Sequence, residues 1–140
     1  EVYNSADAFV LPTRGEGWGL PAIQAMSMAK PTISTNWGGN TEFMDSRNSF
    51  LIPLDGVVEV EEDSVYGWNL GKKWALPSVD GLTKILQYLP THREHARKVG
   101  LRGRRHVAKH FSEQALAKII DRQLDVVRTK VMQRRLSKKT

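Results

Sequence analysis

A glycine-rich turn between a short apolar run and a helical pattern constrains this chain most strongly. The apolar run, residues 8–12, predicts a buried strand, and the helical pattern over residues 21–29 opens with Pro21, which suits a first helical turn. The residues between them include one acid, Glu16, among glycines. We term residues 14–19 the acidic turn. Glycines let a ligand approach the backbone closely, and the N–H groups of a first helical turn face anions, so this order predicts an anion-binding site.

Glu16 is unusual in such a site because a carboxylate repels a bare phosphate. It suits a ligand that also has hydroxyl groups, because a carboxylate accepts hydrogen bonds from them. A sugar attached to a phosphate has both features. The alternative is that Glu16 only stabilises the N-terminus of the following helix electrostatically. The local pattern leaves both interpretations open.

The first 54 residues alternate between strand-like and helix-like segments. Strands are expected at residues 8–11, 32–35 and 50–54, and helices at 1–7, 21–29 and 41–44. A second glycine-rich turn, residues 36–40, follows the second strand. The alternation predicts an α/β fold with a Rossmann-like parallel sheet flanked by helices.

The remaining residues are mostly helical in pattern. Residues 57–63 alternate and predict either a short strand or an acidic loop. Leu82, Ile85, Leu86 and Leu89 have helical spacing, and residues 91–109 predict a basic helix that Gly100 and Gly103 weaken. Ser112 is expected to cap a last amphipathic helix. Its apolar stripe comprises Leu116, Ile119, Ile120, Leu124, Val127 and Val131.

Composition narrows the class of protein. The chain of 140 residues has no cysteine, which excludes disulfides and thiolate metal sites, and no apolar run long enough to span a membrane. We expect a cytoplasmic protein and, because the chain starts abruptly without Met, a piece of a longer one. Residues 92–140 contain 15 Lys or Arg against 4 Asp or Glu. A contact with an anionic membrane surface is one interpretation of this charge, and a solvated helical face is the other.

Other chemistry is not indicated. His106 and His110 have metal-ligand spacing, but Val107 stands where the zinc-protease motif needs Glu, so we interpret the pair as exposed histidines. The basic segment lacks interleaved aromatic residues, which argues against binding to nucleic acid.

Three segments together resemble a known family. The run from Val2 to Pro12, the turn Glu16-Gly-Trp-Gly-Leu20 with Ala25-Met26 after it, and Gly38-Gly-Asn-Thr-Glu-Phe-Met44 occur in the order found there. The chain resembles the C-terminal, nucleotide-sugar-binding domain of GT-B-fold retaining glycosyltransferases, family 4-like (group 1). The resemblance covers most of residues 1–54 and, loosely, residues 74–130.

The resemblance implies a donor site without a metal or other cofactor, with a nucleoside-diphosphate sugar as the donor. Glu16 corresponds to the family's first glutamate, which contacts sugar hydroxyls and is our candidate catalytic residue. The backbone of Gly17, Trp18, Gly19 and Leu20 would hold the sugar and the diphosphate. Gln24 stands where the family has a second glutamate that binds the ribose, and this departure predicts weakened but retained binding. Trp18 is equally well explained as a core residue.

The resemblance also implies a division of the chain. Residues 1–110 would form part of the donor-binding domain, and residues 111–140 a C-terminal amphipathic helix with a basic tail. The acceptor-binding N-terminal domain would lie outside this sequence, so the fragment alone is expected to be inactive, and the acceptor is unknown. Two alternatives stay open, namely a non-catalytic subunit with the same fold and a basic module that binds an anionic surface.

Overall fold

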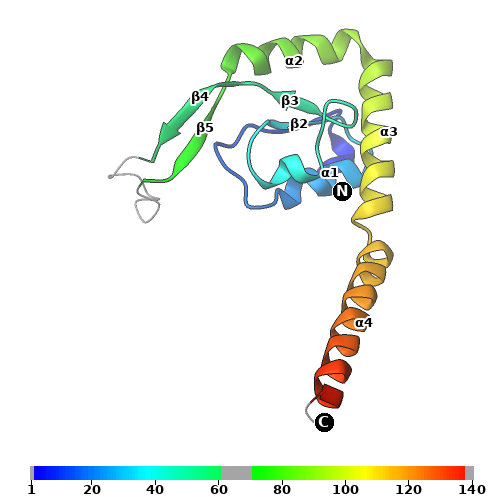
Figure 1. Cartoon of the computed structure of the whole chain (residues 1–140). Coiled ribbons are helices and arrows are strands. Elements are labelled where there is room, and N and C mark those ends of the chain that lie inside the picture. The colour runs from blue at the N-terminus through cyan, green and yellow to red at the C-terminus, as the bar shows by residue number, and fades with distance from the viewer. Residues whose placement is uncertain (1, 61–70, 138–140) are drawn as a thin grey trace. The chain divides into compact units, whose positions relative to one another are not determined.

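A parallel sheet of three strands lies in the first part of the chain in this structure, a computed structural model that describes residues 2–60 and 71–137 (Figure 1). The strands are β1 (Phe9–Leu11), β2 (Thr32–Thr35) and β3 (Phe50–Ile52), in that order across the sheet. Phe9 pairs with Thr32, and Ile33 pairs with Phe50. All four residues of the central strand β2 are buried, as expected when helices cover a parallel sheet. The predicted α/β fold with a Rossmann-like sheet is confirmed.

Helices flank this sheet within the first of two compact units, Glu1–Val107 and Ala108–Thr140. Helix α1 (Leu20–Ser27) contacts β1 and β2, and α2 (Val79–Thr91) contacts β3. The α2 residues Leu82, Ile85 and Leu89 pack with strand residues, as their spacing predicts, whereas Leu86 of the same stripe is exposed. The core cluster consists of Ile33, Ile52, Leu89 and Ala96, with Ala8, Phe50, Leu82 and Ile85 packed against it.

Several predicted elements have different bounds. The expected N-terminal helix is a short 3-10 turn, η1 (Val2–Ser5), and the helix expected at residues 41–44 is a 3-10 turn, η2 (Gly39–Glu42). Helix α1 starts one residue before Pro21 and ends at Ser27, because Ala29 adopts a left-handed conformation with φ of 58° that stops the helix.

The strand predicted at residues 50–54 has the wrong bounds, because these residues belong to two strands. The chain ends β3 at Ile52 and starts a second strand, β4 (Leu54–Glu59), which pairs antiparallel with β5 (Lys73–Pro77). Val58 pairs with Trp74 in this hairpin. Residues 57–63 are predicted as a short strand or an acidic loop, and the strand is confirmed as far as Glu59, where β4 ends. Residues 61–63 lie outside the described part of the chain.

Helix α3 (Arg93–His110) contains two glycines that the sequence predicts only to weaken it. Gly100 and Gly103 are buried, and each lets the helix approach other backbone closely. A Cβ atom at Gly100 would lie 2.2 Å from the carbonyl oxygen of Ala29, and one at Gly103 would lie 2.9 Å from that of Asn48. The glycines therefore allow close packing of this helix in addition to lowering its intrinsic propensity.

The second unit contains α4 (Glu113–Ser137). The predicted cap is confirmed, since the backbone N–H of Ala115 donates to Ser112 Oγ at 3.3 Å. The apolar stripe of this helix is exposed. Among the described residues, no helix is both long and apolar enough to cross a membrane.

Candidate functional site

The acidic turn follows β1 and leads into α1, so it lies at the carboxyl end of the parallel sheet. Gly19 precedes α1 in a left-handed conformation with φ of 88°, which glycine adopts without strain. Pro21 lies in the first helical turn, where its missing N–H costs no helical hydrogen bond. The sequence therefore directs the N-terminus of α1, with its partial positive charge, toward this edge of the sheet.

The Glu16 side chain is half-buried and has no hydrogen bond or ion pair with any described residue. The carboxylate is therefore able to accept hydrogen bonds from a ligand, and electrostatic stabilisation of the helix N-terminus, which needs no hydrogen bond, is compatible with the same arrangement. The backbone N–H groups of Gly17 and Gly19 donate to no described group either. A carboxylate and backbone donors without partners are thus present in one short turn.

The acidic turn is attached to two other segments through its backbone. The N–H of Gly39 in η2 donates to the Glu16 carbonyl at 2.8 Å, and the N–H of Ala75 in β5 donates to the Arg14 carbonyl at 2.8 Å. The Arg14 guanidinium also lies over the Trp74 ring, 5.4 Å from its centroid. The hairpin and η2 therefore hold the first half of the turn, at Arg14 and at Glu16.

Trp18 and Leu20 expose apolar surface beside Glu16. The Trp18 side chain is 39% exposed, and its ring packs on the buried Phe43 ring with centroids 5.5 Å apart. Trp18 is therefore partly packed and partly accessible, so its expected role in binding stays a prediction. Leu20 is 62% exposed at the start of α1.

Gln24 lies exposed on α1 and has a partner that the sequence did not predict. The Tyr3 hydroxyl donates to Gln24 Oε1 at 3.0 Å. An amide oxygen has two lone pairs, so this bond leaves it able to accept a second hydrogen bond, and Nε2 remains a donor. Nothing in the local sequence signals the pair, because 21 residues separate the two side chains.

Asn40 connects the second glycine-rich turn to the sheet and is another residue that sequence reasoning missed. Its side chain is fully buried, and Nδ2 donates to the Thr35 carbonyl at 2.8 Å and to Ser34 Oγ at 3.2 Å. The Ser34 hydroxyl in turn donates to the Leu11 carbonyl at 3.1 Å. The end of β1, the end of β2 and η2 are thereby joined in one hydrogen-bonded group.

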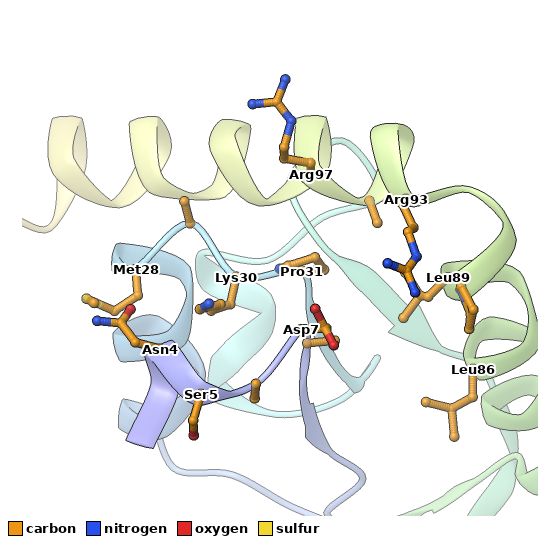
Figure 2. A pocket seen from close by; sticks show the side chains of 15 residues that line it. Asn4, Ser5, Asp7, Met28, Lys30, Pro31, Leu86, Leu89, Arg93 and Arg97 are labelled. Carbon is orange, nitrogen blue, oxygen red and sulfur yellow. The ribbon is translucent and has the colours of Figure 1, made fainter. Parts of the chain in front are cut away.

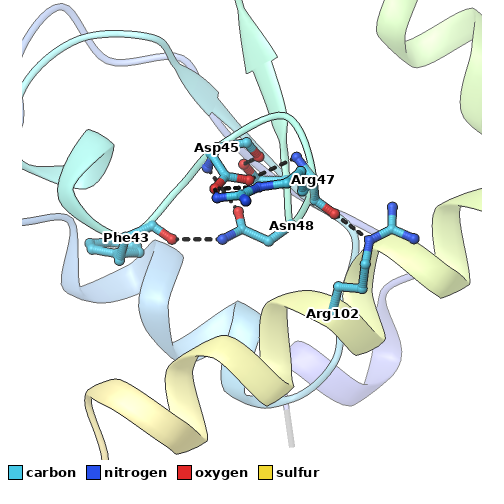
Figure 3. Close-up of polar contacts among 6 residues, drawn as sticks. Phe43, Asp45, Arg47, Asn48 and Arg102 are labelled. Atoms are coloured by element: carbon cyan, nitrogen blue, oxygen red, sulfur yellow. Dashed lines mark hydrogen bonds and ion pairs between the residues drawn. The ribbon is translucent and has the colours of Figure 1, made fainter.

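A polar turn after η2 supports Phe43 and contacts α3 (Figure 3). Asn48 Nδ2 donates to the Phe43 carbonyl at 3.0 Å, and the Arg102 side chain on α3 donates to the Arg47 carbonyl. Arg47 Nη2 donates to the Asp45 carboxylate at 2.6 Å, and this hydrogen bond lowers the pKa of the Asp45 carboxyl. Because Phe43 packs on Trp18, this turn belongs to the frame of the site.

A hollow of about 530 Å³ lies elsewhere (Figure 2). Its lining includes Asp7 and Lys30, which precede β1 and β2, and Leu89 and Arg93 at the junction of α2 and α3. It therefore opens at the amino ends of the strands, whereas the acidic turn is at their carboxyl ends. Ligands of open parallel sheets bind at the carboxyl ends, so we assign the site to the acidic turn. Among the described residues, no group of three or more His, Asp or Glu could hold a metal ion.

The sequence resembles known glycosyltransferases. The profile of the family "Glycosyl transferases group 1" matches residues 1–63. Sucrose synthase 6 of Oryza sativa subsp. japonica is 32% identical over 98 residues, which are 61% of this chain and 11% of that protein. Mannosylfructose-phosphate synthase of Agrobacterium fabrum is 46% identical over 39 residues, 28% of this chain and 9% of that protein. The chain thus spans about a tenth of the length of these relatives.

Two solved structures share the fold. Sucrose-phosphate synthase of Thermosynechococcus elongatus aligns with a TM-score of 0.67 and 22% identity over 92% of this chain and 27% of that one. The C-terminal domain of a glycosyl transferase group 1 family protein from Francisella tularensis aligns with a TM-score of 0.59 and 21% identity, over 80% of this chain and 47% of that one.

Proposed function

We propose that this chain, which fits the C-terminal domain of a group 1 glycosyltransferase with the GT-B fold, binds the donor in the parent enzyme's sugar transfer. The donor would be a nucleoside-diphosphate sugar. The main support is the half-buried Glu16 carboxylate, which has no partner among the described residues and shares a turn with unpartnered backbone donors at the N-terminus of α1.

The two chemical parts of the donor would have separate partners. Glu16 would accept hydrogen bonds from sugar hydroxyls. The backbone N–H groups from Gly17 to Leu20 would donate to the sugar and the diphosphate, and the positive end of α1 favours the same anion. Gln24 would bind the ribose.

These partners also suit the chemistry of transfer. When the bond from the sugar to the diphosphate breaks, negative charge develops on the leaving diphosphate. Backbone donors that already face this position lower the barrier, because they need no reorganisation during the reaction. We propose that the transfer retains the anomeric configuration and that the helix N-terminus serves in place of a metal ion.

Gln24 would make the donor site weaker than one with glutamate. An amide accepts from one ribose hydroxyl and donates to the other, whereas a carboxylate accepts from both. Losing the ionic hydrogen bonds costs on the order of 1 kcal/mol. The Tyr3 hydroxyl occupies one lone pair of Gln24 Oε1 and leaves the other lone pair and Nε2 for the two ribose hydroxyls.

The test uses the full-length parent protein and a panel of UDP-, GDP- and ADP-linked sugars. We expect one donor to bind and to be consumed, with a product whose anomeric configuration, measured by proton NMR, matches that of the donor. Glu16→Gln should lower kcat/KM at least tenfold, since it removes an ionic acceptor worth about 1.4 kcal/mol. Glu59→Gln, the same change at an exposed position of β4, is the control. Equal activity of the two variants would refute the role of Glu16.

A non-catalytic subunit with the same fold is the second candidate. Gln24, in place of the expected glutamate and with Tyr3 as its partner, favours it. This candidate predicts that the parent binds a nucleotide sugar, or none, without turnover. The same panel of donors separates it from the enzyme.

The basic module is a further proposal that concerns other residues. Arg104 and Arg105 on α3 are exposed and form no ion pair with a described residue, whereas Lys98 on the same helix pairs with Glu94. Binding to vesicles that contain anionic lipid, lost at high salt and lost on removal of residues 92–140, would support this proposal.

A further inference from the structure

The second glycine-rich turn lies directly against the acidic turn. A Cβ atom at Gly39 would lie 2.0 Å from the carbonyl oxygen of Gly17 and 2.9 Å from the Cα of Trp18. A Cβ atom at Gly38 would lie 2.8 Å from the Glu16 carbonyl oxygen. Both positions therefore exclude any side chain while the acidic turn stays in place.

The two glycines are required for different reasons. Gly38 has a φ of 92°, so the course of its own backbone already favours glycine. Gly39 has no positive φ, and a side chain there would be compatible with its backbone conformation. Only the approach of Gly17 and Trp18 excludes one. A turn that merely reversed the chain would need Gly38 but not Gly39.

The residues around Gly39 attach η2 to the sheet. Asn40 fixes η2 to the end of β2 through the Thr35 carbonyl and Ser34 Oγ. Gly19 lies close to the same residue, since a Cβ atom at Gly19 would be 3.1 Å from Asn40 Cβ. Asn40 thus fixes η2 to the sheet, and the Gly39 N–H of η2 holds the acidic turn at the Glu16 carbonyl.

We infer that Gly39, through its N–H bond to the Glu16 carbonyl and its close approach to Gly17, is a positioning residue for the acidic turn. It sets where the Glu16 carboxylate and the backbone donors of residues 17–19 lie. This inference rests on the proposed function, because it assigns Gly39 a role in holding the donor. Gly39 itself would not touch the donor.

The test compares two glycine-to-alanine variants of the full-length protein. In Gly39→Ala the methyl group must displace the acidic turn. In Gly56→Ala, the matched control in β4 outside that turn, a Cβ atom meets nothing within 4 Å and φ is not positive. A displacement of about 1 Å in a site costs about 100-fold in kcat/KM. We expect that loss in Gly39→Ala, with less than twofold change in Gly56→Ala. Activity of Gly39→Ala within twofold of the unmodified protein would overturn the inference.

A second measurement uses the unmodified protein and does not depend on how the variant folds. Hydrogen exchange of the Gly39 amide reports its bond to Glu16 directly. The amide should be protected without ligand, and the donor found in the panel of nucleotide sugars should slow its exchange further, because a held donor fixes the acidic turn. A merely structural turn predicts no such slowing, and that result would also overturn the inference.

The inference and the proposed function fail in different ways. If no nucleotide sugar binds, the proposed function fails and the Gly39 role in donor binding fails with it. If a donor binds and is transferred but the Gly39 amide exchanges freely and Gly39→Ala keeps full activity, only the inference fails. Slower exchange of the Gly39 amide with the donor bound, together with a loss confined to Gly39→Ala, supports both.

Discussion

Replacing Gly100 by alanine tests whether close packing or helix propensity decides the stability of the first unit. Propensity alone predicts a gain of about 1 kcal/mol, because alanine is the better helix former. The structure predicts the opposite sign. The new Cβ would lie 2.2 Å from the Ala29 carbonyl oxygen and 2.9 Å from its carbonyl carbon, whereas ordinary carbon–oxygen contacts are about 3.3 Å or longer.

The size of the effect follows from what must move. The new Cβ at position 100 and the Ala29 carbonyl oxygen must move apart by about 1 Å. The Ala29 carbonyl belongs to the backbone, so no flexible side chain can relieve this overlap. Inserting a methyl group into such a contact costs about 1–3 kcal/mol, and we expect the upper end. After the propensity gain, Gly100→Ala should lose about 2 kcal/mol of the free energy of unfolding. For a unit of this size the melting temperature should fall by about 8 °C.

Thermal unfolding followed by circular dichroism measures this change. Gly103→Ala is the graded comparison, because its Cβ would meet the Asn48 carbonyl oxygen at 2.9 Å and the flexible end of Met26 at 3.3 Å. It should lose less than Gly100→Ala. Gly56→Ala, where nothing lies within 4 Å, is the control. A Gly100→Ala variant as stable as the unmodified protein would refute the packing argument.

Two further predictions concern the donor site and its frame. Gln24→Glu should tighten donor binding about fivefold, because about 1 kcal/mol of ionic hydrogen bonding is gained. Calorimetric titration of the full-length protein with the donor measures this affinity. An unchanged affinity would mean that Gln24 does not touch the ribose. Asp45 has a lowered pKa in the folded state because of its hydrogen bond to Arg47. Its contribution to stability is therefore present above the unfolded pKa, near 3.9, and is lost as pH falls through the lower folded value. Unfolding measured from pH 6 to pH 2 should show a smaller acid loss in Asp45→Asn, and an unchanged pH dependence would contradict the Asp45–Arg47 assignment.

The sequence predicted the parallel sheet and the place of the acidic turn because both depend on local order. A β-branched run such as Thr32-Ile-Ser-Thr35, flanked by turns, predicts a buried strand from its own residues. Glycines around Glu16 followed by Pro21 predict a turn and a helix start in the same way. The position of Glu16 at the carboxyl end of β1 then follows from chain direction alone.

The features that the sequence did not predict depend on contacts between distant residues. The β4–β5 hairpin needs the pairing of Val58 with Trp74 across a long connection, and its first strand follows β3 after one residue, so the apolar run looked like one strand. Gly100 looked like a weak point of a helix because the Ala29 carbonyl that meets it lies 71 positions earlier. The hydrogen bond between Tyr3 and Gln24 was not predicted for the same reason, because the two residues lie far apart in the sequence.

The hydrogen-bonded group formed by Leu11, Ser34 and Asn40 has a consequence for enzymology. Its members are a carbonyl, a hydroxyl and an amide, none of which gains or loses a proton in the range where enzymes are assayed. The scaffold beneath the acidic turn should therefore keep one shape from mildly acidic to mildly alkaline buffer. Any pH dependence of activity within that range would then report groups other than these three.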